Sequence, residues 1–206
     1  SECAYNLTAD MAGIPTKALA ESMECLGEYD KAKAEAVHKA EDKTDHLEDV
    51  IGSYLVKLST KQLNEEEGAM ASVLLKAIGD FERISDHAVN IVESAEEMRE
   101  KGIEFSEQAQ KEIVKMKTTC LEAIDDLLKP GMGEVEFLSA VAQMEQKIDD
   151  MTDDFRRGQI QRMRAGLCNQ EACIIYSELL TDFERIGDHV LNIAEELTKA
   201  HVALAE

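Results

Sequence analysis

The chain has 206 residues, of which 44% are hydrophobic, so it is long enough to bury a substantial core. Its 43 acidic and 22 basic residues give a formal net charge of -21, which argues against binding to nucleic acid because such binding depends on Lys and Arg. Only 4% of the residues are aromatic and only 2 are Pro, while strong helix formers are abundant, so we predict an all-α protein.

Cap and turn residues divide the first half of the chain into three predicted helices. The first covers residues 5 to 27, with Pro15 in an early turn or at a kink, and the second runs from about 30 to 60. Asn64 is followed three residues later by Glu, which is the pattern of a capping box at the start of a third helix. Gly102 is expected to end that helix.

Three more helices are predicted in the second half. Ser106 caps a helix that runs to Lys129, and the stretch PGMG at 130–133 interrupts the chain. A fifth helix then continues to about Gly166, and Asn169 begins the sixth. Helices of this length are expected to lie side by side in bundles.

Two acidic stretches occur twice. The stretch DFERISDHAVNIVE at 80–93 returns as DFERIGDHVLNIAE at 182–195, with ten of 14 positions identical. Upstream, EDKTDHLED at 41–49 is similar to EQKIDDMTD at 145–153. Both pairs keep the same order, so the sequence predicts two tandem three-helix bundles related by an internal repeat. The predicted domains are residues 1–102 and 103–206.

The repeated acids occupy an unusual place on their helices. Glu82 and Asp86 border the apolar stripe and lie four residues apart, where two like charges destabilise a helix by a few tenths of a kcal/mol. The same spacing recurs at Glu184 and Asp188. Carboxylate oxygens are the ligands that hard and borderline cations prefer. Stacked carboxylates on two helices of each bundle therefore indicate a cation site.

The motif DFERIxDHxxNI, preceded by a helix with an ExxxDxxxD pattern, resembles the PhoU family of phosphate-uptake regulators over essentially the whole chain. The resemblance implies two tandem three-helix bundles that bind metal clusters, with iron or zinc as the expected metal and nickel or magnesium as alternatives. Asp80 and Asp182 would be secondary ligand candidates. The main ligand candidates would be Glu41, Asp45, Asp49, Glu82, Asp86, Glu145, Asp149, Asp153, Glu184 and Asp188.

The same resemblance implies a non-enzymatic regulator of phosphate uptake, with no catalytic residue. Its expected partners are a phosphate transporter or the associated sensor kinase and ATPase components. Related domains also form the cytoplasmic C-terminus of sodium/phosphate cotransporters, and a chain that begins at Ser1 is compatible with a preceding transmembrane domain. We expect a cytoplasmic location at the inner face of the membrane, and a homodimer because the 9 Met residues favour adaptable surfaces.

A second kind of metal site has a weaker basis. His38, Asp42 and His46 are spaced by four residues, and Glu35-x-x-His38 has the form that ferritin-like di-iron bundles use twice. Here it occurs once, which disfavours the alternative of a ferritin-like metalloenzyme or metal-storage bundle. A local zinc or nickel site, and an adaptor bundle with no metal, stay open.

The other polar residues of the repeat have structural interpretations. Arg83 and Arg185 are predicted to form salt bridges with Asp80 and Asp182, and the two His residues that follow Asp86 and Asp188 either to support the metal ligands or to have packing roles. The Arg-rich stretch FRRGQIQRMR at 155–164 is interpreted as a solvated face or a docking site for an acidic partner or phosphate. The five Cys residues show no CxxC spacing, so we predict no disulfide framework and a reducing environment.

Overall fold

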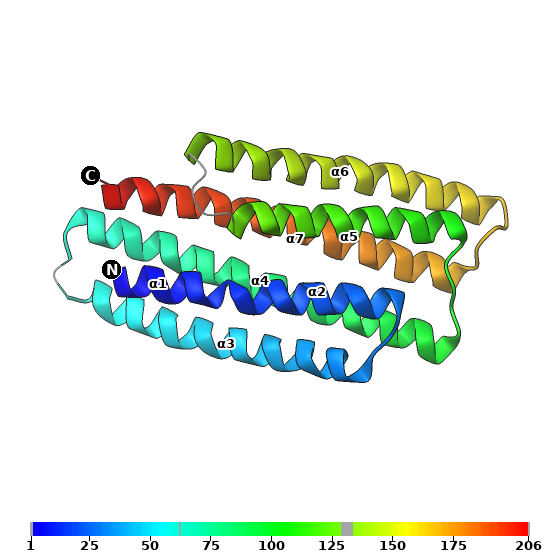
Figure 1. Ribbon diagram of the computed structural model, residues 1–206, viewed down its shortest axis with the longest axis horizontal. Helices are drawn as coiled ribbons and strands as arrows, with labels where there is room; N and C mark the ends of the chain where they lie inside the picture. Colours follow the sequence, from blue (N-terminus) through cyan, green and yellow to red (C-terminus); the bar gives the residue numbers. More distant parts are fainter. Residues whose placement is uncertain (1, 62, 129–133, 206) are drawn as a thin grey trace.

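A computed structural model of the chain describes residues 2–61, 63–128 and 134–205, and these residues form seven α-helices and no strand (Figure 1). The prediction of an all-α protein is therefore confirmed. Most of these helices are long and lie side by side. The helices are α1 (Glu2–Met11), α2 (Gly13–Gly27), α3 (Lys31–Ser59), α4 (Glu65–Lys101), α5 (Glu107–Leu128), α6 (Glu134–Arg164) and α7 (Gln170–Ala205).

The first predicted helix was wrong in one respect, because it is two helices. α1 ends at Met11, and α2 begins at Gly13 with Pro15 in its first turn. Pro15 has no amide hydrogen, so it cannot donate to the carbonyl four residues earlier, and a proline is tolerated best in a first turn. The hydroxyl of Thr16 donates to the carbonyl of Ala12 at 2.7 Å and satisfies an acceptor at the break.

The other predicted boundaries that fall within the described residues agree closely with the structure. Asn64 and Glu67 form the complete capping box that begins α4, and Gly102 ends this helix in the left-handed conformation with φ of 64°. At the start of α7, the side-chain oxygen of Asn169 accepts a hydrogen bond from the amide of Ala172 at 2.7 Å. The predicted break at 130–133 lies outside the described residues.

Contacts group the helices into two sets. α1, α2, α3 and α4 pack against one another, as do α5, α6 and α7, and the most extensive interface between any two helices joins α4 to α7 (Figure 1). The two helices that carry the repeated DFERI stretch thus form the main contact between the halves, and α2 and α5 add a smaller one. The exact division into domains at residue 102 stays a prediction.

One buried polar network joins the three helices of the second half. Both carboxylate oxygens of Glu112 on α5 accept hydrogen bonds from the guanidinium of Arg162 on α6, at 3.1 and 2.7 Å. The hydroxyl of Tyr176 on α7 donates to the same carboxylate at 2.5 Å. Because the side chains of Glu112 and Arg162 are only 7% and 13% exposed, this ion pair is shielded from solvent.

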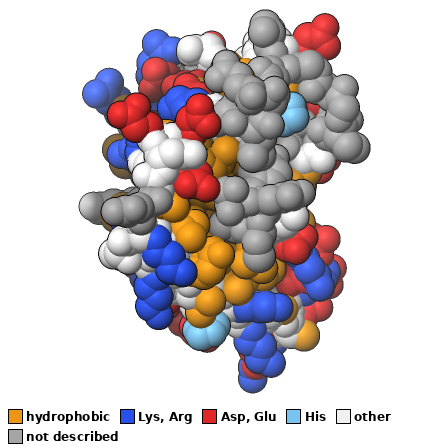
Figure 2. All heavy atoms as spheres, turned by 90° about the vertical axis from the view of Figure 1, so that its left-hand side faces the viewer, with side chains coloured by type: hydrophobic (Ala, Val, Ile, Leu, Met, Phe, Trp, Pro, Cys, Tyr) orange, Lys and Arg blue, Asp and Glu red, His pale blue; other side chains and the backbone are white. Residues whose placement is uncertain are grey.

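The end of the molecule that carries both termini has an apolar patch among the residues that the structure describes. Figure 2 shows hydrophobic side chains gathered on this face between charged ones. Where α3 leads into α4, leucine and methionine side chains line a cavity of about 50 Å³, which has room for very little beyond water. Across the described part of the chain, no helix is both long and apolar enough to cross a membrane.

Candidate metal sites

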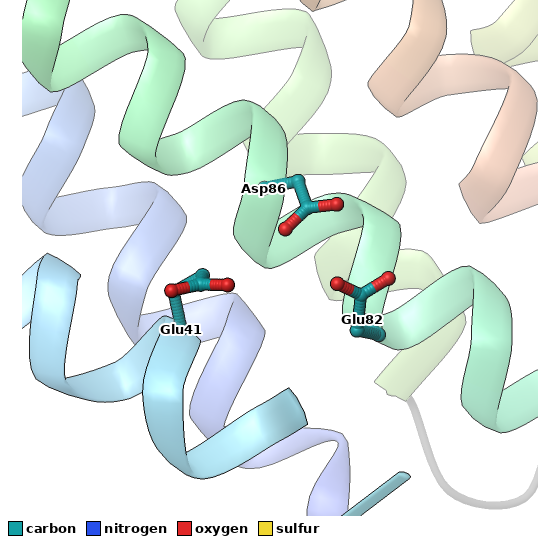
Figure 3. Close-up of side chains that lie close together, drawn as sticks. All are labelled: Glu41, Glu82 and Asp86. Carbon is teal, nitrogen blue, oxygen red and sulfur yellow. The ribbon is translucent and has the colours of Figure 1, made fainter. Parts of the chain in front are cut away.

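Carboxylates of the first half converge between α3 and α4. Glu41 extends from α3 toward Glu82 and Asp86 on α4, and Figure 3 shows the three carboxylates directed into the same space. One oxygen from each lies within 4.8 Å of the others, which is close enough for a single cation to contact all three. All three side chains are partly buried.

A second convergent group overlaps the first and includes a residue that the sequence reasoning missed. Oxygens of Asp45, Glu48 and Glu82 also lie within 4.8 Å of one another. Glu82 therefore belongs to both groups. We call these five residues, Glu41, Asp45, Glu48, Glu82 and Asp86, the first acidic cluster.

Helix geometry explains why Glu48 joins the cluster and Asp49 does not. At about 100° per residue, Asp45 is turned by about 40° from Glu41, Glu48 by about 20° in the opposite sense, and Asp49 by about 80°. Asp49 is accordingly exposed and belongs to neither group. The ExxxDxxxD pattern predicted that the third acid lies eight residues after Glu41. The acid that joins the cluster is Glu48, which lies seven residues after it.

The second half forms a smaller group of the same kind. Glu145 and Asp149 on α6 and Asp188 on α7 bring oxygens within 4.8 Å of one another, and we call these three the second acidic cluster. Among the described residues, the Oδ1 atom of Asp149 is buried without a hydrogen-bond partner, as is the hydroxyl of Thr152. A buried carboxylate oxygen without a donor is unusual, and a bound cation would satisfy it.

Two predicted ligands of the second half lie outside this cluster. Asp153 is exposed, for the same reason of helix geometry as Asp49. Glu184 pairs with Arg156, whose Nη1 atom lies 3.7 Å from its Oε2 atom. By the register of the repeat, Arg156 occupies the position of Gly52 and Thr152 that of Glu48. In the second half, Thr152 therefore stands in place of an acid, and Arg156 holds Glu184 outside the cluster.

Burial and mutual repulsion raise the pKa of five carboxyl groups in the two clusters. Desolvation is the larger cause, followed by the hydrogen bond and charge of Asp86, and together they raise the pKa of Glu82 to about 8. Desolvation and the charge of Asp149 raise the pKa of Glu145 to about 7. Burial also raises the pKa of Glu41, Glu48 and Asp149. Each cluster is therefore a site where negative charge is costly without a counter-ion.

These pKa shifts predict how the metal-free protein responds to pH. Folding raises the pKa of Glu82 and Glu145 from the ordinary value of 4.5, so between that value and about 7 to 8 the folded chain binds more protons than the unfolded one. Their contribution to stability therefore falls as the pH rises through this range. With chelator present, we expect a lower melting temperature at pH 8 than at pH 6.

The control for this experiment removes the two titrating groups. In a Glu82→Gln/Glu145→Gln variant, neutral side chains replace both acids, and most of the difference in melting temperature between pH 6 and pH 8 should disappear. Circular dichroism at both pH values measures it. An equally large difference in the variant would show that the pH dependence arises elsewhere in this acidic chain.

Other residues that recur in both copies of the repeat form a reciprocal contact between the halves. His87 Nδ1 lies 2.9 Å from Asp182 Oδ1, and His189 Nδ1 lies 2.7 Å from Asp80 Oδ1. The amide of Asn90 donates to the same oxygen of Asp182 at 3.2 Å, and Asn192 donates equivalently to Asp80 at 3.3 Å. The two imidazole rings lie 5.6 Å apart between α4 and α7.

This contact corrects the predicted role of four residues. Asp80 and Asp182 accept hydrogen bonds across the interface, and neither belongs to the acidic groups. Arg83 and Arg185 do not pair with them, because each Arg lies near a carboxylate of its own helix, Glu82 and Asp188 respectively. The prediction paired each aspartate with an Arg of its own helix, whereas the partners of both aspartates come from the other half.

Loss of Asp80 should weaken the interface between the halves. An Asp80→Ala variant leaves the half-buried His189 and the exposed Asn192 without their shared acceptor, and hydrogen bonds to charged groups contribute about 1.5 to 3 kcal/mol. We expect the free energy of unfolding in urea to fall by about 2 kcal/mol. Glu93→Ala, at an exposed position of the same helix, is the control. A loss no larger than that of the control would contradict the role of this contact.

The remaining sequence candidates are not brought together. His38, Asp42 and His46 are exposed, and no convergent group within the described ranges contains them. In the Arg-rich stretch, Arg162 pairs with Glu112 inside the molecule, and Arg156 pairs with Glu184 at a partly exposed position. Arg157 and Arg164 are exposed, so only part of the stretch is engaged in contacts between helices.

Comparisons with known proteins agree with the repeated architecture. A family model described as PhoU domain matches the chain twice, at residues 8–95 and 113–197. The phosphate-specific transport system accessory protein PhoU homolog 1 of Thermotoga maritima is 27% identical over 194 residues, covering 91% of this chain and 81% of the relative.

Solved structures share the fold. The crystal structure of PhoU from Pseudomonas aeruginosa matches with a TM-score of 0.87 at 21% identity, covering 98% of this chain and 96% of that one. The phosphate transport system regulatory protein PhoU from Streptococcus pneumoniae matches with a TM-score of 0.78 at 17% identity, covering 97% and 94%. At these identities the likeness establishes the fold.

Proposed function

Because the chain belongs to the PhoU family, we propose that it is a non-enzymatic regulator of phosphate transport whose two acidic clusters bind metal ions. The family match covers both halves, and the relative from Thermotoga maritima carries the name of a phosphate-specific transport accessory protein. The proposed partners are a phosphate transporter and its ATPase or sensor-kinase components, at the cytoplasmic face of the membrane. A second copy of the chain is a further proposed partner.

The observation that carries the metal proposal is the recurrence of convergent carboxylates at equivalent places. α3 and α4 build the first acidic cluster, and α6 and α7 build the second. All of these ligands are carboxylates, a donor set that suits cations such as iron and also accommodates zinc. We propose that the first cluster holds metal through its five acids, and the second through Glu145, Asp149 and Asp188.

A bound cation would do two things for the chain. It would offset the repulsion that raises the pKa of Glu82 and Glu145, and its ligands would link α3 to α4 or α6 to α7. Because α4 and α7 carry ligands and also form the interface between the halves, metal occupancy would fix the surface offered to a partner. We propose this link between metal and regulation.

Uptake of radiolabelled phosphate tests the regulatory function. Deletion of the gene should abolish the dependence of uptake on external phosphate, and expression of the native chain should restore it. An Asp86→Asn/Asp188→Asn variant should fail to restore it, whereas the exposed-site control Glu93→Gln should succeed. Uptake that is unchanged by deletion would contradict the proposal.

The same experiment addresses a chain that is part of a sodium/phosphate cotransporter, which we propose as the alternative setting. Extension of the reading frame upstream of Ser1 would reveal a transporter domain in the same polypeptide. In that case sodium-dependent uptake would respond to the variants, and an ATP-driven system would not.

A further inference from the structure

Two thiols lie almost in bonding contact where α6 turns into α7. The Sγ atoms of Cys168 and Cys173 are 2.7 Å apart, compared with about 2.05 Å in a disulfide bond. Both residues are free cysteines. The sequence offered no sign of this pair, because four residues separate the two and the spacing is not CxxC.

Local backbone geometry accounts for the contact. Gly166 adopts a φ of 71°, which turns the chain sharply after α6 and places Cys168 in the short connection. Asn169 then caps α7, and Cys173 follows in the first turns of that helix. The turn and the cap together fold the connection back over the start of α7, so that the two side chains meet.

The pair differs in access from the other described cysteines. Cys25 and Cys120 are buried, whereas Cys168 and Cys173 are half-buried. Cys173 also lines an apolar cavity of about 300 Å³, beside Ile160, Met163 and Ile174. A small oxidant can therefore reach these two thiols more readily than the two in the core.

We propose that Cys168 and Cys173 form a reversible dithiol–disulfide pair that hydrogen peroxide oxidises. The sulfur of Cys168 attacks one peroxide oxygen, giving a sulfenic acid and one water. The sulfur of Cys173 then attacks the sulfenic sulfur, its proton leaves with the hydroxyl group as a second water, and the S–S bond forms. Two electrons pass from the two thiols to the peroxide. A dithiol reductant reverses the reaction by thiol–disulfide exchange.

The assignment of roles follows from the surroundings of Cys173. Burial and the neighbouring thiol raise the pKa of Cys173 to about 11, so this residue stays protonated at neutral pH. Cys168 also lies in the connection between the exposed Leu167 and Asn169, so we assign the attack to Cys168 and the resolving role to Cys173.

Oxidation would act on the polar network of the second half. The side-chain amide of Gln159 donates to Cys173 Sγ at 3.5 Å, and its oxygen accepts from Arg162 Nε at 2.8 Å. Arg162 in turn holds Glu112 on α5. A disulfide would link the connection covalently to α7 and alter the contact between Cys173 and Gln159. The redox-sensitive pair is therefore adjacent to the network that joins α5, α6 and α7. This inference does not depend on metal binding.

Peptide mapping of the whole chain tests the proposal. Folded protein is treated with hydrogen peroxide, blocked with iodoacetamide, unfolded and cleaved after Glu171, which lies between the two cysteines. We expect two peptides joined by a disulfide, which separate after reduction. In a second oxidised sample that is not treated with iodoacetamide, titration of the unfolded protein should find three thiols in place of five, since two of the five are joined, and dithiothreitol should restore all five.

Variants make the result specific. Cys25→Ser leaves four thiols, and oxidation by peroxide should lower the number of free thiols to two, because the pair remains. Cys168→Ser should retain all four through the same treatment in a protein that stays helical by circular dichroism. Absence of the joined peptides from oxidised native protein, or loss of two thiols from the Cys168→Ser variant, would overturn the proposal.

Discussion

Replacement of Glu112 by alanine should lower the free energy of unfolding by about 3 to 5 kcal/mol. The change removes the carboxylate that holds the guanidinium of Arg162 and the hydroxyl of Tyr176, both inside the bundle. The largest cost is the positive charge of Arg162, which is left with a side chain only 13% exposed and no carboxylate beside it. Urea unfolding followed by circular dichroism measures the difference.

An exposed ion pair of the same helix provides the control. Glu107 pairs with Lys111 at 2.7 Å, but both side chains are mainly exposed, and such pairs contribute at most about 1 kcal/mol. Glu107→Ala should therefore have a small effect. If Glu112→Ala were no more destabilising than this control, the buried ion pair would not be what holds α5, α6 and α7 together.

Metal should raise the melting temperature of the chain. A ligand that binds only the folded state at a hundredfold excess over its Kd stabilises that state by about 2.7 kcal/mol per site. For a chain of this size, that corresponds to about 5 to 10 °C per site. Addition of a chelator to metal-loaded protein should reverse the increase, as followed by thermal unfolding with iron or zinc.

The acids outside the clusters supply matched controls for this experiment. Asp86→Asn and Asp188→Asn each remove one clustered ligand and should reduce the effect of the chelator. Asp49→Asn and Asp153→Asn make the same chemical change at exposed positions and should leave it intact. If the exposed pair of variants mattered as much as the clustered pair, the proposed ligand sets would be wrong.

Local signals in the sequence predicted most helix boundaries correctly, because caps act over a few residues. Asn64 with Glu67, and Gly102 at the other end of α4, satisfy terminal amides and carbonyls through their own side chains or backbone conformation. The break at Ala12 was missed because a proline in a first turn and a proline at a kink give the same sequence pattern. Only the packed structure separates these two cases.

The sequence predicted that acids on two helices of each half form a cation site, but it did not predict which acids of each helix take part. The pairing of Glu82 with Asp86 follows from a spacing of four residues, but the inclusion of Glu48 and the exclusion of Asp49 depend on which side of α3 faces α4. The contact between His189 and Asp80 joins residues 109 positions apart. Sequence periodicity within a helix carries no information about such a contact.

Elemental analysis of the purified protein tests the central claim most directly. If each half of the repeat builds a cation site, native protein from metal-supplemented growth should retain iron or zinc. The Asp86→Asn and Asp188→Asn variants should each lose the metal that is bound by one half. The double variant should retain essentially none while remaining helical. Native protein that carries no metal, or a double variant with the metal content of the native chain, would show that the repeated acids are not metal ligands.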